Sequence, residues 1–232
     1  LAQELIAEPA AEDPIILPTP DRIAGDVFQV TNGGPPPIGV EVILVTLDAQ
    51  DAQVDEESVR VADDGRFEFT DLTKGDQYRY VLVSQYGPIQ QTVRVEDAIN
   101  PEDITLRIYE STPSLDSITA TSFITVIPRV DKETQVMGVL EMVELSNGGD
   151  RTFVADLNSA APGESPVMLR FRLPESYADL TVESDLPSGN VMEVATGFAL
   201  NNAIPPGDFR ILFSYVVEFD GSEMIFNRSM PI

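Results

Sequence analysis

The sequence predicts an all-β protein of two tandem antiparallel β-sandwiches, preceded by an extended N-terminal segment. Three observations support this fold class. Apolar and polar residues alternate with a period of two through most of the chain, which is typical of half-buried strands. Turn signals rich in Gly, Pro and Asn separate these stretches. Beyond one turn near residues 96–103, no stretch has helical periodicity, and 232 residues suit two sandwiches of ordinary size.

Changes in composition divide the chain into four parts. Residues 1–24 are acidic and contain four prolines, so we expect an extended segment. Residues 25–109 form the first predicted sandwich. Residues 118–232 form the second, and the polar stretch 110–117 is the linker between them.

The first sandwich is expected to hold about seven strands. Phe67 and Phe69 alternate with charged residues. They follow an Asp-Asp-Gly turn at 63–65, so residues 58–62 and 66–70 should form a hairpin. The expected strands are, in order, 26–31, 40–47, 58–62, 66–70, 77–85, 89–95 and 104–109.

The second sandwich begins with a long strand pair joined near residues 131–132. The stretch 167–173 alternates without interruption, and Asp220-Gly221 is a hairpin signal. The expected strands are, in order, 118–128, 134–145, 152–154, 167–173, 180–182, 191–194, 209–219 and 224–228.

Composition excludes several classes of function. The chain has 39 acidic and 14 basic residues, and the resulting formal charge of −25 is spread over its whole length. Such a surface repels nucleic acid and anionic lipid. His, Cys and Trp are all absent. Nucleophilic catalysis therefore lacks its usual base, zinc lacks its usual ligands, and carbohydrate lacks its usual aromatic platform, so we expect no enzyme and no cofactor.

The candidate metal site is the acidic stretch 48–57, which we expect to be a loop. Its oxygen ligands suit calcium, and the candidate ligands are Asp48, Asp51, Asp55 and Glu56. A solvated acidic loop is the alternative. A second candidate, an aromatic binding face made by Tyr78, Tyr80 and Tyr86, has core packing as its alternative.

The candidate partner-binding residues are Ile15, Ile16 and Leu17, the one apolar cluster of the N-terminal segment. This cluster either covers an edge strand of its own chain or docks on another subunit. We call residues 14–20 the N-terminal strap.

The first sandwich resembles the carboxypeptidase regulatory-like (transthyretin-like) domain. The resemblance is carried by residues 39–44, by residues 62–72, whose pattern is Asp-x-Gly-x-Phe-x-Phe-x-x-Leu from Asp63 onward, and by Gly75 and Tyr78. It implies a non-catalytic β-sandwich that serves as a spacer or an interaction module.

The second sandwich is similar to the segment that follows this module in some bacterial membrane-anchored surface proteins. The similar stretches are 140–147, 149–154, 169–174, 205–207 and 213–215. That resemblance implies an extracellular or cell-surface location after removal of a signal peptide. It also implies contact with a membrane only through an anchor outside this sequence.

The expected function is therefore a non-catalytic structural or assembly subunit at a bacterial cell surface, a spacer or filament-type component. Its expected partners are proteins, including copies of itself, and not nucleic acid. Two alternatives stay open: a ligand-binding module for carbohydrate or protein, and an accessory extracytoplasmic subunit of a membrane complex.

Overall fold

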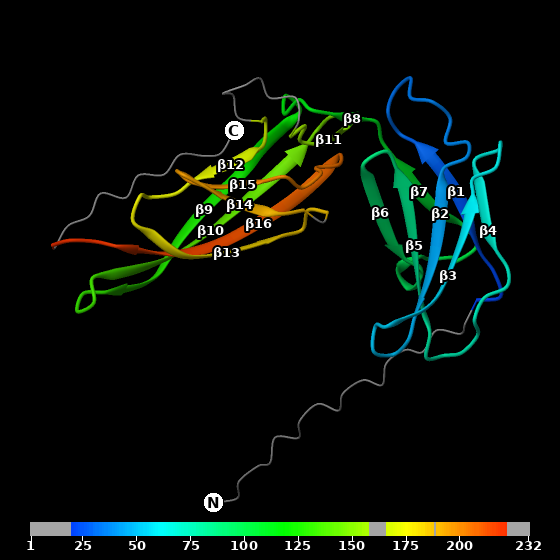
Figure 1. Cartoon of the computed structure of the whole chain (residues 1–232), viewed down its shortest axis with the longest axis horizontal. Helices are drawn as coiled ribbons and strands as arrows, with labels where there is room; N and C mark the ends of the chain where they lie inside the picture. The colour runs from blue at the N-terminus through cyan, green and yellow to red at the C-terminus, as the bar shows by residue number, and fades with distance from the viewer. Residues whose placement is uncertain (1–19, 158–165, 188, 222–232) are drawn as a thin grey trace, which may run out of the picture.

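The computed structural model describes residues 20–157, 166–187 and 189–221. In this part of the chain the secondary structure is almost entirely β-strand, which confirms the predicted all-β class (Figure 1). One 3₁₀ turn, Val95–Asp97, overlaps the start of the predicted helical turn near residues 96–103. No helix among the described residues is long and apolar enough to cross a membrane.

Seven strands, β1 to β7, form the N-terminal sandwich. They are β1 (Ile23–Gln29), β2 (Glu41–Leu47), β3 (Gln53–Arg60), β4 (Arg66–Phe69), β5 (Arg79–Tyr86), β6 (Ile89–Arg94) and β7 (Ile104–Ile108). One sheet has the order β4-β1-β7 and the other β3-β2-β5-β6. Alternate residues of both sheets face a shared core, which includes Leu44, Phe69, Leu82 and Leu106.

The C-terminal sandwich contains β8 to β16. They are β8 (Ser111–Thr112), β9 (Ile118–Asp131), β10 (Val136–Asn147), β11 (Thr152–Phe153), β12 (Leu169–Arg172), β13 (Tyr177–Ser184), β14 (Val191–Val194), β15 (Gly197–Leu200) and β16 (Gly207–Glu218). The main sheet has the order β13-β16-β10-β9 and faces β12-β15-β14. Phe171 and Phe198 stack at 4.7 Å between ring centroids, with Phe213 edge-on to both, at the centre of this core.

Two strand pairs are parallel, where the sequence predicted antiparallel sheets throughout. β1 pairs with β7 over five residues, and β8 pairs with β11 over two. The first exception follows from the chain path. β7 is the last strand before the linker, so it runs toward the end of the N-terminal sandwich that meets the C-terminal sandwich (Figure 1). β1 runs in the same direction, and the two neighbouring strands are therefore parallel.

The predicted hairpin of residues 58–62 and 66–70 is wrong. β3 pairs with β2, whereas β4 pairs with β1 in the other sheet. The Asp-Asp-Gly turn is present, with Ala62 N donating to Arg66 O at 2.9 Å, but it carries the chain from one sheet to the other. Local patterning identified the turn correctly but not the partner that each strand would take.

The predicted acidic loop is also partly wrong, because β3 already begins at Gln53. Most of its side chains are exposed, so charge costs little there, and its position at the edge of the sheet explains why. In the predicted linker, two residues separate the end of β7 from the start of β8, and β8 pairs with β11. The linker is therefore hydrogen-bonded to the C-terminal sandwich.

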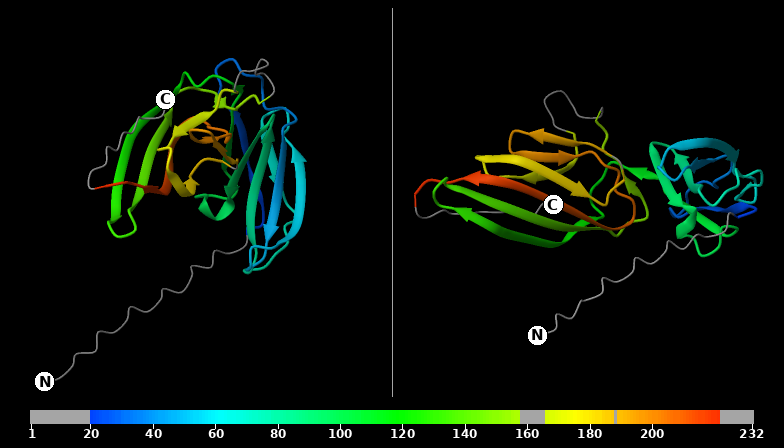
Figure 2. Two further views of the ribbon diagram at one scale, coloured as in Figure 1. Left: turned by 60° about the vertical axis from the view of Figure 1, so that its left-hand side comes forward. Right: turned by 90° about the horizontal axis from the view of Figure 1, so that it is seen from below.

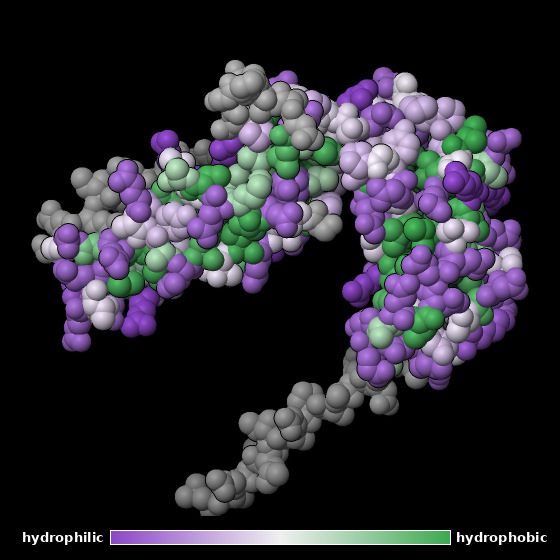
Figure 3. Space-filling view, viewed as in Figure 1, coloured by the Kyte–Doolittle hydropathy of each residue, from purple (hydrophilic) through white to green (hydrophobic). Residues whose placement is uncertain are grey.

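The two sandwiches meet at one end and diverge from it (Figure 2). β1 begins at the end of the N-terminal sandwich that lies away from this junction, and β9 runs from the junction toward the far end of the C-terminal sandwich (Figure 1). Hydrophilic residues cover much of the visible surface, and hydrophobic residues show as smaller patches on both sandwiches (Figure 3).

Candidate functional site

The junction between the sandwiches is built from three short segments. Two are turns with the same Asn-Gly-Gly sequence, at residues 32–34 in the N-terminal sandwich and 147–149 in the C-terminal one. The third, residues 110–112, is the chain that passes between them. Gly33 has a φ of 72°, a left-handed conformation that favours glycine. The backbone of the first turn therefore explains why a glycine stands at this position.

Thr31 joins the three segments through one hydroxyl group. Its Oγ1 donates to the backbone oxygen of Asp150 at 2.6 Å and accepts from the backbone N–H of Glu110 at 2.9 Å. The residue is only 3% exposed, so water does not readily replace either bond. A single buried side chain of one sandwich thus satisfies backbone groups that belong to the other sandwich and to the linker.

Asp150 adds a second bond across the junction. Its Oδ2 accepts from the backbone N–H of Asn32 at 2.9 Å. The turn that carries Asp150 is itself fixed by Asn147, which is 3% exposed and whose Nδ2 donates to the backbone oxygens of Arg151 and Ile204. The acceptor at the junction is therefore held by the core of the C-terminal sandwich.

The linker is hydrogen-bonded on both sides. Glu110 offers its carboxylate to the Tyr86 hydroxyl, in a short hydrogen bond, and to Gln29 Nε2 at 3.4 Å. Its backbone oxygen accepts from Thr152 N at 2.9 Å, in the C-terminal sandwich. Burial, followed by the hydrogen bond and charge of Glu110, raises the pKa of Tyr86 above its usual value.

Two of the candidate calcium ligands, Asp48 and Asp51, lie at the start of the acidic stretch and contact different groups of the protein. Asp48 Oδ1 accepts from the backbone N–H groups of Gln50 and Ala52 at 2.9 Å each, which stabilises the turn. Asp51 has a φ of 62° and forms an ion pair of 2.7 Å with Arg79. Both carboxylates therefore already have partners within the protein.

The other two candidate ligands lie on β3. Asp55 Oδ2 accepts from Thr73 Oγ1 at 3.0 Å, and Glu56 Oε2 accepts from Gln53 Nε2 at 2.9 Å. Among the described residues, no three acidic side chains come together in a group that could hold a metal ion. The structure does not gather the four candidates into one site.

The three tyrosines do not form one binding face. Tyr80 is 4% exposed, packs in the core and donates to the backbone oxygen of Thr73 at 2.6 Å. Tyr78 is partly buried against the same core, and Tyr86 belongs to the junction. The candidate partner-binding residues Ile15, Ile16 and Leu17 lie outside the described residues.

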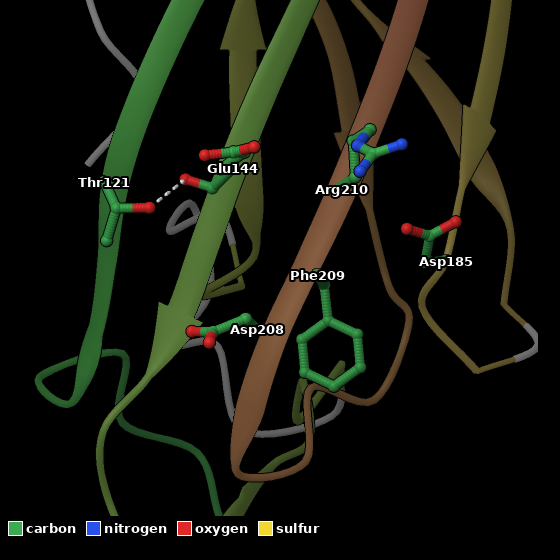
Figure 4. Close-up of a pocket in the computed structure, with 6 residues that line it drawn as sticks. All are labelled: Thr121, Glu144, Asp185, Asp208, Phe209 and Arg210. Carbon is green, nitrogen blue, oxygen red and sulfur yellow. Dashed lines mark hydrogen bonds between the residues drawn. The ribbon is translucent and has the colours of Figure 1, made fainter.

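An open concavity of about 420 Å³ lies on the outer face of the main sheet of the C-terminal sandwich. It is lined by Thr121, Glu144, Asp185, Asp208, Phe209 and Arg210 (Figure 4). Arg210 stands between Glu144 and Asp185 in this view, and Thr121 Oγ1 donates to the backbone oxygen of Glu144 at 3.3 Å. The lining of the concavity therefore combines three carboxylates with one arginine, one hydroxyl group and one aromatic ring.

Each Asn-Gly-Gly segment is a turn signal by itself, but nothing in the sequence indicates that the two turns meet. Thr31 and Asp150 are 119 positions apart, and only the fold brings them together. Their shared sequence pattern is the one signal that could have suggested a matched pair of turns. The motif shared with the carboxypeptidase regulatory-like domain has a structural role: Phe67, Phe69 and Leu72 are buried in the core.

Comparison with known protein families gives no match, and comparison with curated proteins gives none either. The resemblance to the carboxypeptidase regulatory-like domain is therefore not confirmed. Two solved structures of the full-length major pilin RrgB of Streptococcus pneumoniae are similar at 12% and 10% identity, with TM-scores of 0.22 and 0.20. They cover 84% and 85% of this chain, which spans 45% of each pilin chain. Similarity this low supports no inference about function.

Proposed function

We propose that this chain is a non-catalytic structural subunit at a bacterial cell surface, a spacer whose two sandwiches are held in a fixed relative orientation. The observation that carries the proposal is the buried Thr31 hydroxyl, which bonds to Asp150 and Glu110 across the junction. A spacer needs a defined length and direction. A junction with internally satisfied hydrogen bonds supplies both, whereas a free linker supplies neither.

Composition supports a role without catalysis. With no His and no Cys, the remaining base for a serine nucleophile is lysine, and the chain has two lysines. Lys74 forms an ion pair of 2.6 Å with Asp21 on the surface, and Lys132 is exposed in the β9–β10 turn. Neither position offers the buried, activated amine that such chemistry requires.

Location and partners belong to the same proposal. A Cys-free chain with a formal charge of −25 stays soluble and resists casual association, so its contacts with other proteins must be specific. We propose that the N-terminal strap, through Ile15, Ile16 and Leu17, is one such contact with a neighbouring subunit.

The fixed orientation can be measured directly because the chain has no native Cys. Spin labels on Thr105→Cys in β7 and Glu183→Cys in β13, both exposed positions, report the distance between the sandwiches. We expect a narrow distance distribution, similar in width to that of a label pair within one sandwich. A distribution several times broader would contradict the proposal.

A further inference from the structure

The edge strand β9 combines a lack of acidic residues with several exposed apolar side chains. Among 39 acidic residues in the chain, none lies between positions 117 and 130, which covers all of β9 except its last residue. Four exposed large aliphatic side chains fall within the last half of this stretch, at 44% to 51% exposure: Ile124, Val126, Ile127 and Val130. An apolar, acid-free strip on such a protein needs a physical explanation.

The backbone of β9 is also open on one side. Among the described residues, β9 pairs with β10 alone, at the end of the order β13-β16-β10-β9. The pairing is regular from Ser122 to Val126, and register shifts flank this segment on both sides. These five residues therefore present the unpaired edge of a regular strand, which is a template for another strand.

Another edge of the molecule is protected in the usual way. β3, an edge of its own sheet, carries Asp55, Glu56 and Glu57 in succession. Charged side chains of this kind prevent pairing with another strand. β9 lacks this protection over its regular segment, so the two edges have opposite character.

We propose that β9 pairs with β9 of a second copy of this chain, antiparallel about a two-fold axis at Ile124. This inference extends the proposed structural role by naming a partner and a surface. In this register Ser122 faces Val126 of the second copy, and Phe123 faces Thr125. The two main sheets would then continue across the axis as one sheet, with the closed two-fold symmetry that is commonest in homodimers.

Charge favours a second copy as the occupant. Two chains of −25 repel each other over most of their surfaces, and the 117–130 stretch is one place where they can approach without placing acid against acid. The edge strand β6 is also free of acidic residues, but it lacks the large exposed aliphatic side chains of β9. In the proposed register, the one charged residue of that stretch, Arg129, faces Thr119. β9 lies at the outer margin of its sandwich, away from the N-terminal sandwich, so a second copy can reach it (Figure 2).

The side chains match as well. Ile124 and Val126 point to the same face of the sheet, and their partners on β10 are Met142 and Leu140. All four are apolar, so pairing about the axis would place the two apolar strips side by side. Aliphatic pairs between neighbouring strands stabilise a sheet, and here they would also remove half-exposed side chains from water.

Single-cysteine variants test the pairing and its register. Ile124→Cys is compared with Val191→Cys and Val54→Cys, which sit on other edge strands at 46% and 48% exposure against 45% for Ile124. Under mild oxidation or with a short bismaleimide linker, Ile124→Cys should form covalent dimer at least about tenfold faster than either control. A mixture of Ser122→Cys and Val126→Cys chains should cross-link as the mixed species. Equal rates for all positions would overturn the proposal.

Light scattering and sedimentation give an independent measurement on the unmodified chain. We expect the mass to rise from 25.3 kDa to at least twice that value with concentration, and more readily in higher salt, which screens the repulsion. Ile124→Lys should lose the association that depends on β9, so its mass at a given concentration should be lower than that of the parent chain, whereas Val54→Lys should behave as the parent chain. A chain that stays monomeric at millimolar concentration overturns the proposal but leaves the junction measurement unaffected.

Two truncations separate the other possible occupants of the β9 edge. If deletion of residues 1–20 abolishes association, the edge accepts the N-terminal strap of a neighbour, and pairing of β9 with itself is wrong. If association appears only after removal of residues 222–232, the end of the same chain covers the edge, and the proposal is wrong as well. Retained association in both truncated chains supports it.

Discussion

Replacement of Thr31 by Val should weaken the junction more than any other single change that removes only a hydroxyl group. Valine has nearly the same shape, so the packing is kept and the hydroxyl is lost. The backbone N–H of Glu110 and the backbone oxygen of Asp150 each lose a partner in a site that is 3% exposed at Thr31. Each unsatisfied buried group costs about 1–2 kcal/mol, or roughly 2–4 kcal/mol in total.

Thr152→Val is the matched control. Thr152 is 0% exposed and lies in β11 beside the linker, and among the described residues its hydroxyl has no hydrogen-bond partner. Removing that hydroxyl should be neutral or should stabilise the chain by up to about 1 kcal/mol, since a buried unpaired hydroxyl is itself unfavourable.

Calorimetry can compare the two variants under the same conditions. Thr31→Val should separate the unfolding of the two sandwiches into distinct transitions, because their coupling is reduced, and Thr152→Val should keep the parent profile. Equal losses in both variants, or no loss in Thr31→Val, would refute the assignment of Thr31 as the bridging residue.

Three further predictions concern other parts of the chain. The pKa of Tyr86 is raised in the folded chain, so the contribution of this residue to the free energy of unfolding should be complete below pH 10. That contribution should be lost as the pH rises through the folded pKa of Tyr86. Ultraviolet titration, with Tyr86→Phe as the reference, checks the raised pKa. Calcium titration should give no saturable heat, since Asp51 and Asp55 already have partners, and a saturable signal abolished by Asp48→Asn would contradict this expectation. Deleting residues 1–20 should leave a β9 pair intact but stop growth into larger assemblies, measured by light scattering; identical masses for both chains would limit the strap to a role within its own chain.

The sequence predicted the strands well where their alternation is set by a core on one side. Val191–Val194 was predicted to the residue, and the pair that became β9 and β10 was predicted with its connecting turn. In both cases the pattern and the turn chemistry are local, so one sequence contains the information.

Other elements depended on contacts that are distant in sequence. β8 has two residues and exists because β11 lies beside it. β15, Gly197–Leu200, is buried at all four residues, so it has no alternation to detect. β3 is exposed on both faces, so its sequence has the polar composition of a loop. Its pairing with β2 makes it a strand, and the sequence alone does not indicate that pairing. The candidate metal site had the same weakness, because the carboxylates are close in sequence but have different partners in space.

The distribution of acidic residues and the rigidity of the junction bear on the same question, which is how such a charged chain could assemble. A charge of −25 suppresses contacts everywhere except where acids are missing, and among the described edge strands β9 combines an acid-free stretch, 117–130, with large exposed aliphatic side chains. Pairing at β9 would fix only the two C-terminal sandwiches. The bonds of Thr31 and Asp150 would then transmit that geometry to the N-terminal sandwiches, so the position of each strap would also be defined. A flexible junction would lose this information, so the spin-label distance between the sandwiches should stay narrowly distributed at concentrations where the β9 pair forms.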